Sequence, residues 1–232
     1  MGAILQCLAL SKHYGHETAL DGVDLSVESG RIIGLLGPNG SGKTTLLKLA
    51  CGMLRADGGS VLVGGMKPCA ETKAMVSYLP DVDYLPKGMK VEALLNMFGD
   101  FFADFDRVRA QSMLDALGLS LKDNLKKLSK GNKEKVALVL AMSRNASLYL
   151  LDEPIGGVDP AARDYILNTI INNYSEDAAV VISTHLIADV EQVLDEAVFI
   201  QNGRVLFHRT VDEIRENEGM SVDALFREVF RC

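Results

Sequence analysis

The chain has 232 residues, which is room for one large domain whose core needs no disulfide or structural metal. Its 24 basic and 31 acidic residues leave a net charge of -7, which argues against an electrostatic nucleic-acid binder, and its 48% hydrophobic content excludes a disordered chain. No stretch approaches the roughly 18 apolar residues that cross a bilayer. The run 7–10 has no basic segment before it and the four cysteines are scattered, so we expect no secretory signal, reduced thiols and no cysteine metal site.

The first part of the chain favours an antiparallel sheet with one wet face. Residues 19–27 partly alternate between apolar and polar side chains, as such a strand requires, and further strands are expected at 3–10 and 60–63. Helical spacing of apolar residues then predicts several helices within 91–146. In the last third, the sequence predicts helices at 160–174, 186–194 and 210–231, and a hairpin that turns at Asn202 and Gly203.

Three short segments consist almost entirely of apolar residues. Such runs predict strands of a parallel sheet that is buried on both faces, and they lie at 32–36, 148–151 and 180–182. A polar loop follows each of them, and ligands of an open α/β sheet bind beyond the carboxyl ends of its strands. We therefore expect the chemistry of the protein at this edge of the sheet.

The first of these loops has the pattern of a phosphate-binding loop, G-x-x-x-x-G-K-[ST]. Its glycines let backbone amides approach a phosphate, and the following helix adds free N–H groups at its N-terminus. We expect Lys43 to reach the β- and γ-phosphates and Thr44 to bind Mg²⁺. The alternative is a glycine-rich turn with a solvated lysine. The candidate nucleotide-binding residues are Gly37, Pro38, Asn39, Gly40, Ser41, Gly42, Lys43, Thr44 and Thr45.

Two carboxylates follow the second apolar strand. Asp152 stands at the edge where the phosphate loop is expected, so it is a candidate ligand of Mg²⁺, directly or through water. Glu153 is a candidate base for an attacking water. By itself, an apolar strand that ends in Asp-Glu is as consistent with structural capping; its place about 100 residues after the phosphate loop favours the catalytic interpretation.

The segment Leu128-Ser129-Lys130-Gly131-Asn132 resembles the LSGGQ signature of ATP-binding cassette (ABC) ATPases. The chain also has the phosphate loop, Leu-Leu-Asp-Glu-Pro, Gly157-Val158-Asp159 and Thr184-His185 in the order and spacing of this family, over about residues 3–208. The resemblance implies an α/β fold of the P-loop NTPase class. It has a parallel core sheet, an N-terminal antiparallel β subdomain and a helical insert near 85–145, in a domain of residues 1–210 that a short helical tail, 211–232, follows.

The resemblance also implies roles for residues outside the phosphate loop. Tyr14 stands where an aromatic ring stacks on adenine, and His185 where a histidine contacts the γ-phosphate and orients the water. Ser129 and Gly131 stand where signature residues bind ATP held by the opposite subunit, and Asp159 where an aspartate crosses the dimer interface. Without the resemblance, Ser129 is interpreted as a helix N-cap. Tyr14 is then interpreted as a core or surface residue.

Two positions depart from the family pattern. Asp81 replaces the usual Gln; a carboxylate still holds magnesium or its water, but it cannot donate a hydrogen bond as an amide does. Lys130 and Asn132 replace Gly and Gln, and similar lysine-containing signatures in export-type cassettes favour export. Residues 122–135 hold six lysines, which is consistent with a solvated face or with a face near ATP or anionic lipid.

The resemblance implies a Mg²⁺-dependent ATPase subunit of a transporter at the cytoplasmic face of the cell membrane. Two cassettes, identical or different, would enclose ATP head to tail, and a separate permease would supply the pathway; no nucleic-acid partner is expected. A docking groove or the core of the insert would contain Tyr84, Leu85, Met89, Met97, Phe98, Phe101 and Phe102. The main alternative is a cytosolic ABC ATPase that acts on ribosomes or DNA. A P-loop kinase or GTPase leaves the signature unexplained.

Overall fold

The computed structural model describes residues 2–156, 158 and 160–230. Within these residues, a six-stranded sheet has the order β5-β6-β7-β3-β8-β9. All neighbouring pairs are parallel except β8 and β9, which form the hairpin predicted around Asn202 and Gly203. The three apolar runs form strands of this sheet, as predicted, and the structure shows that the three strands are adjacent. The strands are β3 (Ile32–Leu36), β5 (Val76–Leu79), β6 (Leu148–Asp152), β7 (Ala179–Thr184), β8 (Glu196–Gln201) and β9 (Arg204–Thr210).

A second, antiparallel sheet has the order β2-β1-β4, which confirms the prediction for the first part of the chain. Its strands are β1 (Ala3–Tyr14), β2 (Glu17–Glu28) and β4 (Gly58–Val63). β1 continues four residues beyond the predicted end, because ladder pairing with β2 persists through polar residues up to Tyr14 and Glu17. The turn that joins the two strands begins at Gly15, which has a positive φ of 60°.

Helices occupy both flanks of the larger sheet. The predicted helical region 91–146 contains three α-helices separated by loops, and the region 186–194 contains only a four-residue helix and a 3-10 turn. The short helix α2, which precedes β5, was not predicted. The helices are α1 (Lys43–Ala50), α2 (Ala70–Met75), α3 (Val91–Phe101), α4 (Arg107–Ala116), η1 (Leu125–Lys127), α5 (Lys130–Met142), α6 (Pro160–Asn173), α7 (Ile187–Val190), η2 (Glu191–Val193), α8 (Val211–Glu218) and α9 (Val222–Phe230).

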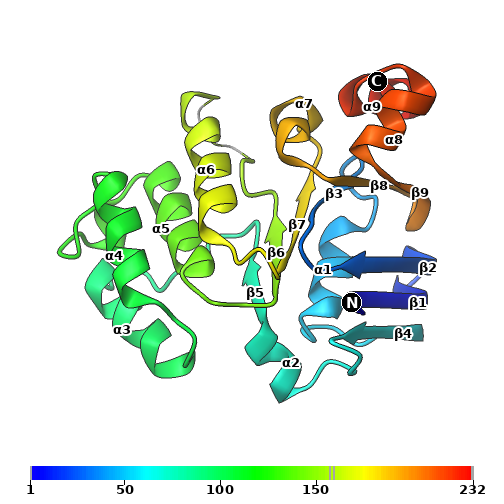
Figure 1. Cartoon of the computed structure of the whole chain (residues 1–232). Helices are drawn as coiled ribbons and strands as arrows, with labels where there is room; N and C mark the ends of the chain where they lie inside the picture. The colour runs from blue at the N-terminus through cyan, green and yellow to red at the C-terminus, as the bar shows by residue number, and fades with distance from the viewer. Residues whose placement is uncertain (1, 157, 159, 231–232) are drawn as a thin grey trace.

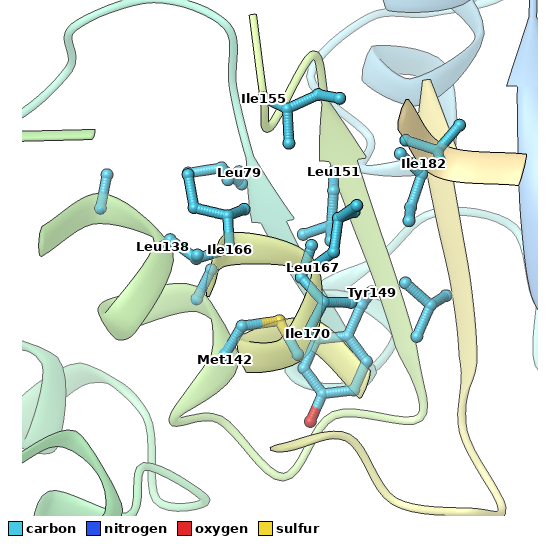
Figure 2. Close-up of a cluster of buried hydrophobic side chains, with 14 of the residues drawn as sticks. Leu79, Leu138, Met142, Tyr149, Leu151, Ile155, Ile166, Leu167, Ile170 and Ile182 are labelled. Carbon is cyan, nitrogen blue, oxygen red and sulfur yellow. The ribbon is translucent and has the colours of Figure 1, made fainter. Parts of the chain in front are cut away.

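The larger sheet is buried on both faces (Figure 1). Because side chains alternate along a strand, Leu148 and Leu150 of β6 pack with α1 and the antiparallel sheet. Tyr149 and Leu151 point to the opposite face, where α5 and α6 cover them (Figure 2). The helix that follows the phosphate loop, α1, therefore packs on one face of the larger sheet, and α5 of the helical insert packs on the other face.

The C-terminal helices share the core of the main sheet. The ring of Phe226 in α9 lies 5.5 Å from that of Phe199 in β8 and 4.3 Å from that of Phe230, measured between centroids.

Cys7, Cys51 and Cys69 are free thiols. Among the described helices, none combines the length and the apolar character needed to cross a membrane.

Arg144 fastens the helical insert to the larger sheet. This residue is 2% exposed, and its Nε donates to Asp104 of the insert at 2.6 Å. Its two terminal nitrogens donate to the carbonyl oxygens of Ala74 and Val76 at 2.7 and 3.3 Å, where β5 begins. The guanidinium also stacks on Phe102 at 3.9 Å from the ring centroid. One buried cation therefore joins the insert to the strand that leads to Asp81.

We expect Arg144→Met to lower the free energy of unfolding by about 3 kcal/mol, because the change leaves Asp104 without its ion pair and two carbonyl groups without donors. Urea denaturation of the full chain measures this loss. The matched control, Arg55→Met, removes an exposed arginine and is expected to change stability by no more than about 0.5 kcal/mol. Equal midpoints for the two variants would contradict the role of Arg144.

Candidate functional site

The polar segments that follow three neighbouring strands meet at one edge of the larger sheet. β6, β7 and β3 are adjacent and parallel, so their carboxyl ends point the same way. The phosphate loop follows β3, Asp152 ends β6, and His185 follows β7. The fold thus brings together the groups that the sequence places more than 140 residues apart.

The phosphate loop is shaped by glycines that no other residue could replace without a shift. Gly42 has a φ of 107°, and a Cβ there would collide with the carbonyl oxygen of Ala19. A Cβ at Gly37 would collide with the carbonyl oxygen of Ile200. Gly42 is also the N-cap of α1 and offers no side chain to the first-turn amides, so these N–H groups are available to an anion.

The side chain of Lys43 folds back onto the phosphate loop. This residue is 6% exposed, and its ammonium donates to the carbonyl oxygens of Gly37 at 2.7 Å and Pro38 at 3.1 Å. The ammonium also lies 3.7 Å from Glu153 Oε1. Burial lowers the pKa of Lys43, and the carboxylates of Glu153 and Asp152 oppose that shift.

Asp152 is the most enclosed carboxylate of the site, with 1% exposure. Its Oδ1 accepts hydrogen bonds from the hydroxyls of Thr44 at 3.1 Å and Ser183 at 2.5 Å. Its Oδ2 is buried and finds no partner among the described residues. A free carboxylate oxygen beside a threonine hydroxyl fits Mg²⁺, which binds proteins through one or two such oxygens together with substrate phosphates. Within the described part of the chain, no set of three or more His, Cys, Asp or Glu side chains forms a metal cage.

Glu153 connects three of the converging groups. Its Oε1 lies 3.0 Å from Nδ1 of His185, and its Oε2 accepts a hydrogen bond from the hydroxyl of Thr184 at 3.0 Å. Its backbone has a positive φ of 48°, a strained conformation for a residue with a side chain. The amide of Glu153 donates to the carbonyl oxygen of Ser183 at 2.9 Å, which holds this turn.

Asp81 follows β5 at the rim of a cleft of about 140 Å³. Lys130 of α5 and both Asp152 and Glu153 line the same cleft. Burial and the charges of Asp152 and Glu153 raise the pKa of Asp81, while Lys130 and His185 act in the opposite direction. Lys130, which also pairs with Glu134 at 3.6 Å, therefore influences the carboxylate at its own subunit's site.

Three further candidate residues belong to elements other than the phosphate loop: Tyr14 to β1, Ser129 to the start of α5 and Gly131 to α5. Tyr14 is half exposed at the end of β1, in a hairpin tied to the phosphate loop through the contact of Ala19 with Gly42. Ser129 caps α5 by accepting a hydrogen bond from the amide of Asn132 at 3.3 Å, and Gly131 lies in the first turn of that helix. Asp159 lies outside the residues that the structure describes. The roles of these four residues stay predictions.

The apolar residues proposed for a docking groove divide into two groups. Leu85 is buried, and Met89, Met97 and Phe98 pack against the same core. Phe101 is 76% exposed and Tyr84 is 38% exposed. Phe102 belongs with the first group, because its ring packs on Phe98 and under the guanidinium of Arg144. Core packing therefore accounts for the first group, and the second group presents the most exposed apolar side chains of the set.

Sequence reasoning missed two hydroxyl groups of the site. Ser183 and Thr184 are fully buried in β7 and bind Asp152 and Glu153, respectively. The available signal was a pair of polar residues that ends an apolar strand. On a buried strand such residues require hydrogen-bond partners, and the carboxylates of the neighbouring strand are the groups within reach.

This arrangement of a glycine-rich loop, a buried lysine and two carboxylates on a parallel sheet, with an antiparallel sheet and a helical insert, defines a P-loop nucleotide-binding cassette. The sequence profile of the family described as ABC transporter matches residues 20–156. A solved structure of the ATP-binding subunit of an ABC transporter superposes with a TM-score of 0.88 at 28% identity, covering 98% of this chain and 99% of the other.

Curated relatives agree with this match. The chain is 30% identical to the Nod factor export ATP-binding protein I of Ralstonia nicotianae, over 93% of this chain and 70% of the relative. It is also 30% identical to the daunorubicin resistance ATP-binding protein DrrA3 of Streptomyces coeruleorubidus, over 94% and 72%. With an uncharacterized ABC transporter ATP-binding protein of Synechocystis sp. it shares 32% identity over 86% of this chain, which spans only 59% of that relative. The chain belongs to the ABC transporter family.

We expect Asp81→Asn to raise the Tm of the nucleotide-free chain at pH 7. A carboxyl whose pKa is higher in the folded than in the unfolded chain costs stability once it is ionised, so stability is lost as pH rises through the two pKa values. The gain in Tm should therefore vanish below the ordinary aspartate pKa of about 3.9. Scanning calorimetry between pH 3.5 and 8 measures it, with the exposed Asp100→Asn as control. A lower Tm at pH 7 would contradict this assignment.

Proposed function

We propose that this chain is the ATP-binding and ATP-hydrolysing subunit of an ABC transporter that powers export through a separate membrane permease. The observation that carries the proposal is the convergence of Lys43, Asp152, Glu153 and His185 beside the phosphate loop. The protein would act at the cytoplasmic face of the cell membrane. The name of one relative, the Nod factor export ATP-binding protein I, supports the export direction, and the resistance in the name of DrrA3 is consistent with it.

In this proposal the loop amides and the Lys43 ammonium bind the β- and γ-phosphates of ATP. Lys43 would exchange its bonds to the Gly37 and Pro38 carbonyls for phosphate oxygens. Thr44 and Asp152 would hold Mg²⁺, with Asp81 as a further candidate ligand. When bound, Mg²⁺ neutralises charge on the phosphates. Positioning and charge stabilisation supply most of the catalysis of phosphoryl transfer, and buried, pre-bonded groups are suited to both.

Glu153 would accept the proton of the water that attacks the γ-phosphorus, while the bond between that phosphorus and the bridging oxygen of ADP breaks. Thr184 and His185 hold the two oxygens of its carboxylate and so fix its direction. A second cassette would close the site with Ser129 and Gly131, at the N-terminus of its own α5, against the same ATP. Tyr14 would stack on adenine, and Asp159 would cross between the two cassettes.

We expect Glu153→Gln to lower kcat by at least about 100-fold with little change in ATP affinity, because an amide cannot take the proton.

We expect Lys43→Ala instead to weaken nucleotide binding and abolish hydrolysis, since the change removes the buried ammonium group of the phosphate loop. Phosphate release and the binding of a fluorescent ATP analogue separate the two effects. Size-exclusion chromatography with ATP should also show a dimer of the Glu153→Gln variant. Normal phosphate release by that variant would eliminate Glu153 as the base.

The permease is tested by purifying the tagged chain from detergent-solubilised membranes of cells that naturally contain it. We expect a protein with several membrane-spanning helices to co-purify, and the Phe101→Asp variant to recover less of it, because Phe101 lies exposed on the insert. The matched control is Met53→Asp, which changes an exposed apolar residue outside the insert. Recovery of ribosomes or nucleic acid instead would favour the non-transport alternative.

A further inference from the structure

The segment that follows His185 is too short to set its own orientation. α7 has four residues and η2 has three, and such short helices are not stable without tertiary contacts. The imidazole of His185 is 42% exposed and is bonded to Glu153. His185 lies between β7, which ends at Thr184, and this segment, so its position depends both on the sheet and on what holds the backbone of residues 187–193.

The C-terminal helix α9 packs directly on this segment. Ile187 and Val190 of α7 are buried in the same core cluster as Val222 and Phe226 of α9. Figure 1 shows α7 and α9 at the same end of the molecule, beyond the end of β7 that carries the site. Apolar packing alone permits small sliding movements, so a directional bond is needed to fix the two elements relative to each other.

Glu191 supplies such a bond. Its Oε2 accepts a hydrogen bond from the backbone amide of Asp223, in the first turn of α9, at 2.8 Å. The hydroxyl of Ser221 accepts from the amide of Ala224 at 3.1 Å, so the start of α9 is capped both by its own chain and by η2. A carboxylate at the start of a helix also interacts favourably with the helix dipole.

The opposite side of α7 has its own anchor. Arg163 of α6 donates to Asp189 Oδ2 at 2.7 Å. The segment is therefore held from α6 through Asp189 and from α9 through Glu191. Glu191 stands six positions after His185, and its hydrogen bond to Asp223 links this stretch of chain to α9.

We propose that α9 is a positioning element for His185, and that Glu191 is the positioning residue through which it acts; this inference rests on the proposed ATP hydrolysis. Loss of the Glu191 bond leaves α7 free to shift against α9, and with it the imidazole that orients Glu153. The backbone of α1 is expected to stay in place, because α1 packs on the other face of the sheet. The link from His185 to Lys43 is the side chain of Glu153, whose Oε1 lies 3.7 Å from the ammonium.

The test compares Glu191→Ala with Glu191→Gln in the full chain. We expect Glu191→Ala to lower kcat for ATP about five-fold, the population change that follows from one lost hydrogen bond, with KM and the affinity for a fluorescent ATP analogue unchanged. Glu191→Gln should retain most of kcat, because the amide oxygen still accepts from Asp223. The control Glu216→Ala removes an exposed carboxylate from α8 and should behave as wild type. All assays run at temperatures where circular dichroism shows each variant folded.

Hydrogen exchange gives a second readout that needs no hydrolysis. Amides of residues 187–193 should exchange faster in Glu191→Ala than in Glu216→Ala, while those of α1 stay unchanged. Wild-type kcat in Glu191→Ala, or unaltered exchange in residues 187–193, overturns the positioning role. A wild-type chain that binds ATP without hydrolysing it overturns the proposed function instead, and faster exchange in Glu191→Ala then still supports the link between α9 and the segment.

Discussion

The site depends on the hydrogen bonds that the buried carboxylate of Asp152 accepts from Thr44 and Ser183. An ionised group with 1% exposure is expensive to bury unless it is bonded, and Asp152 receives hydroxyl hydrogen bonds from two directions. Thr44 comes from the helix after β3 and Ser183 from β7, so a single oxygen fixes three neighbouring elements. The other oxygen has no partner among the described residues. In the proposed function, one oxygen of Asp152 holds the neighbouring elements together and the other would bind Mg²⁺.

Glu153 also joins several elements through one carboxylate, which contacts the side chains of Lys43, Thr184 and His185. The left-handed backbone at this residue costs of order 1–3 kcal/mol, and the surrounding bonds hold it there. The site is therefore assembled before nucleotide arrives. In the proposed function, a phosphate would take the place of the Gly37 and Pro38 carbonyl oxygens as the partner of Lys43.

Much of the fold could be predicted because its signals are local. The apolar runs of β3, β6 and β7 and the glycine pattern of the phosphate loop each lie within a few residues, and both were found where predicted. Other features depend on neighbours distant in sequence. Arg144 gives no sign that it will join Asp104 to the start of β5. The helical pattern of 186–194 likewise does not reveal that this segment forms a four-residue helix and a 3-10 turn, or that α9 packs on it. The roles of Ser183 and Thr184 likewise needed the β6–β7 pairing.

The substitution of a carboxylate for an amide at position 81 connects the insert to the site through charge. Asp81 stands with Asp152 and Glu153 at one cleft, where like charges oppose its ionisation. Lys130, at the first position of α5, lowers that cost from the other wall of the cleft. Because α5 belongs to the insert and Asp81 follows the strand that Arg144 fastens to it, any movement of α5 relative to β5 changes the electrostatic free energy at the edge where Asp152 lies. Through Lys130, the helical insert therefore contributes to the electrostatics of Asp81 at this cleft.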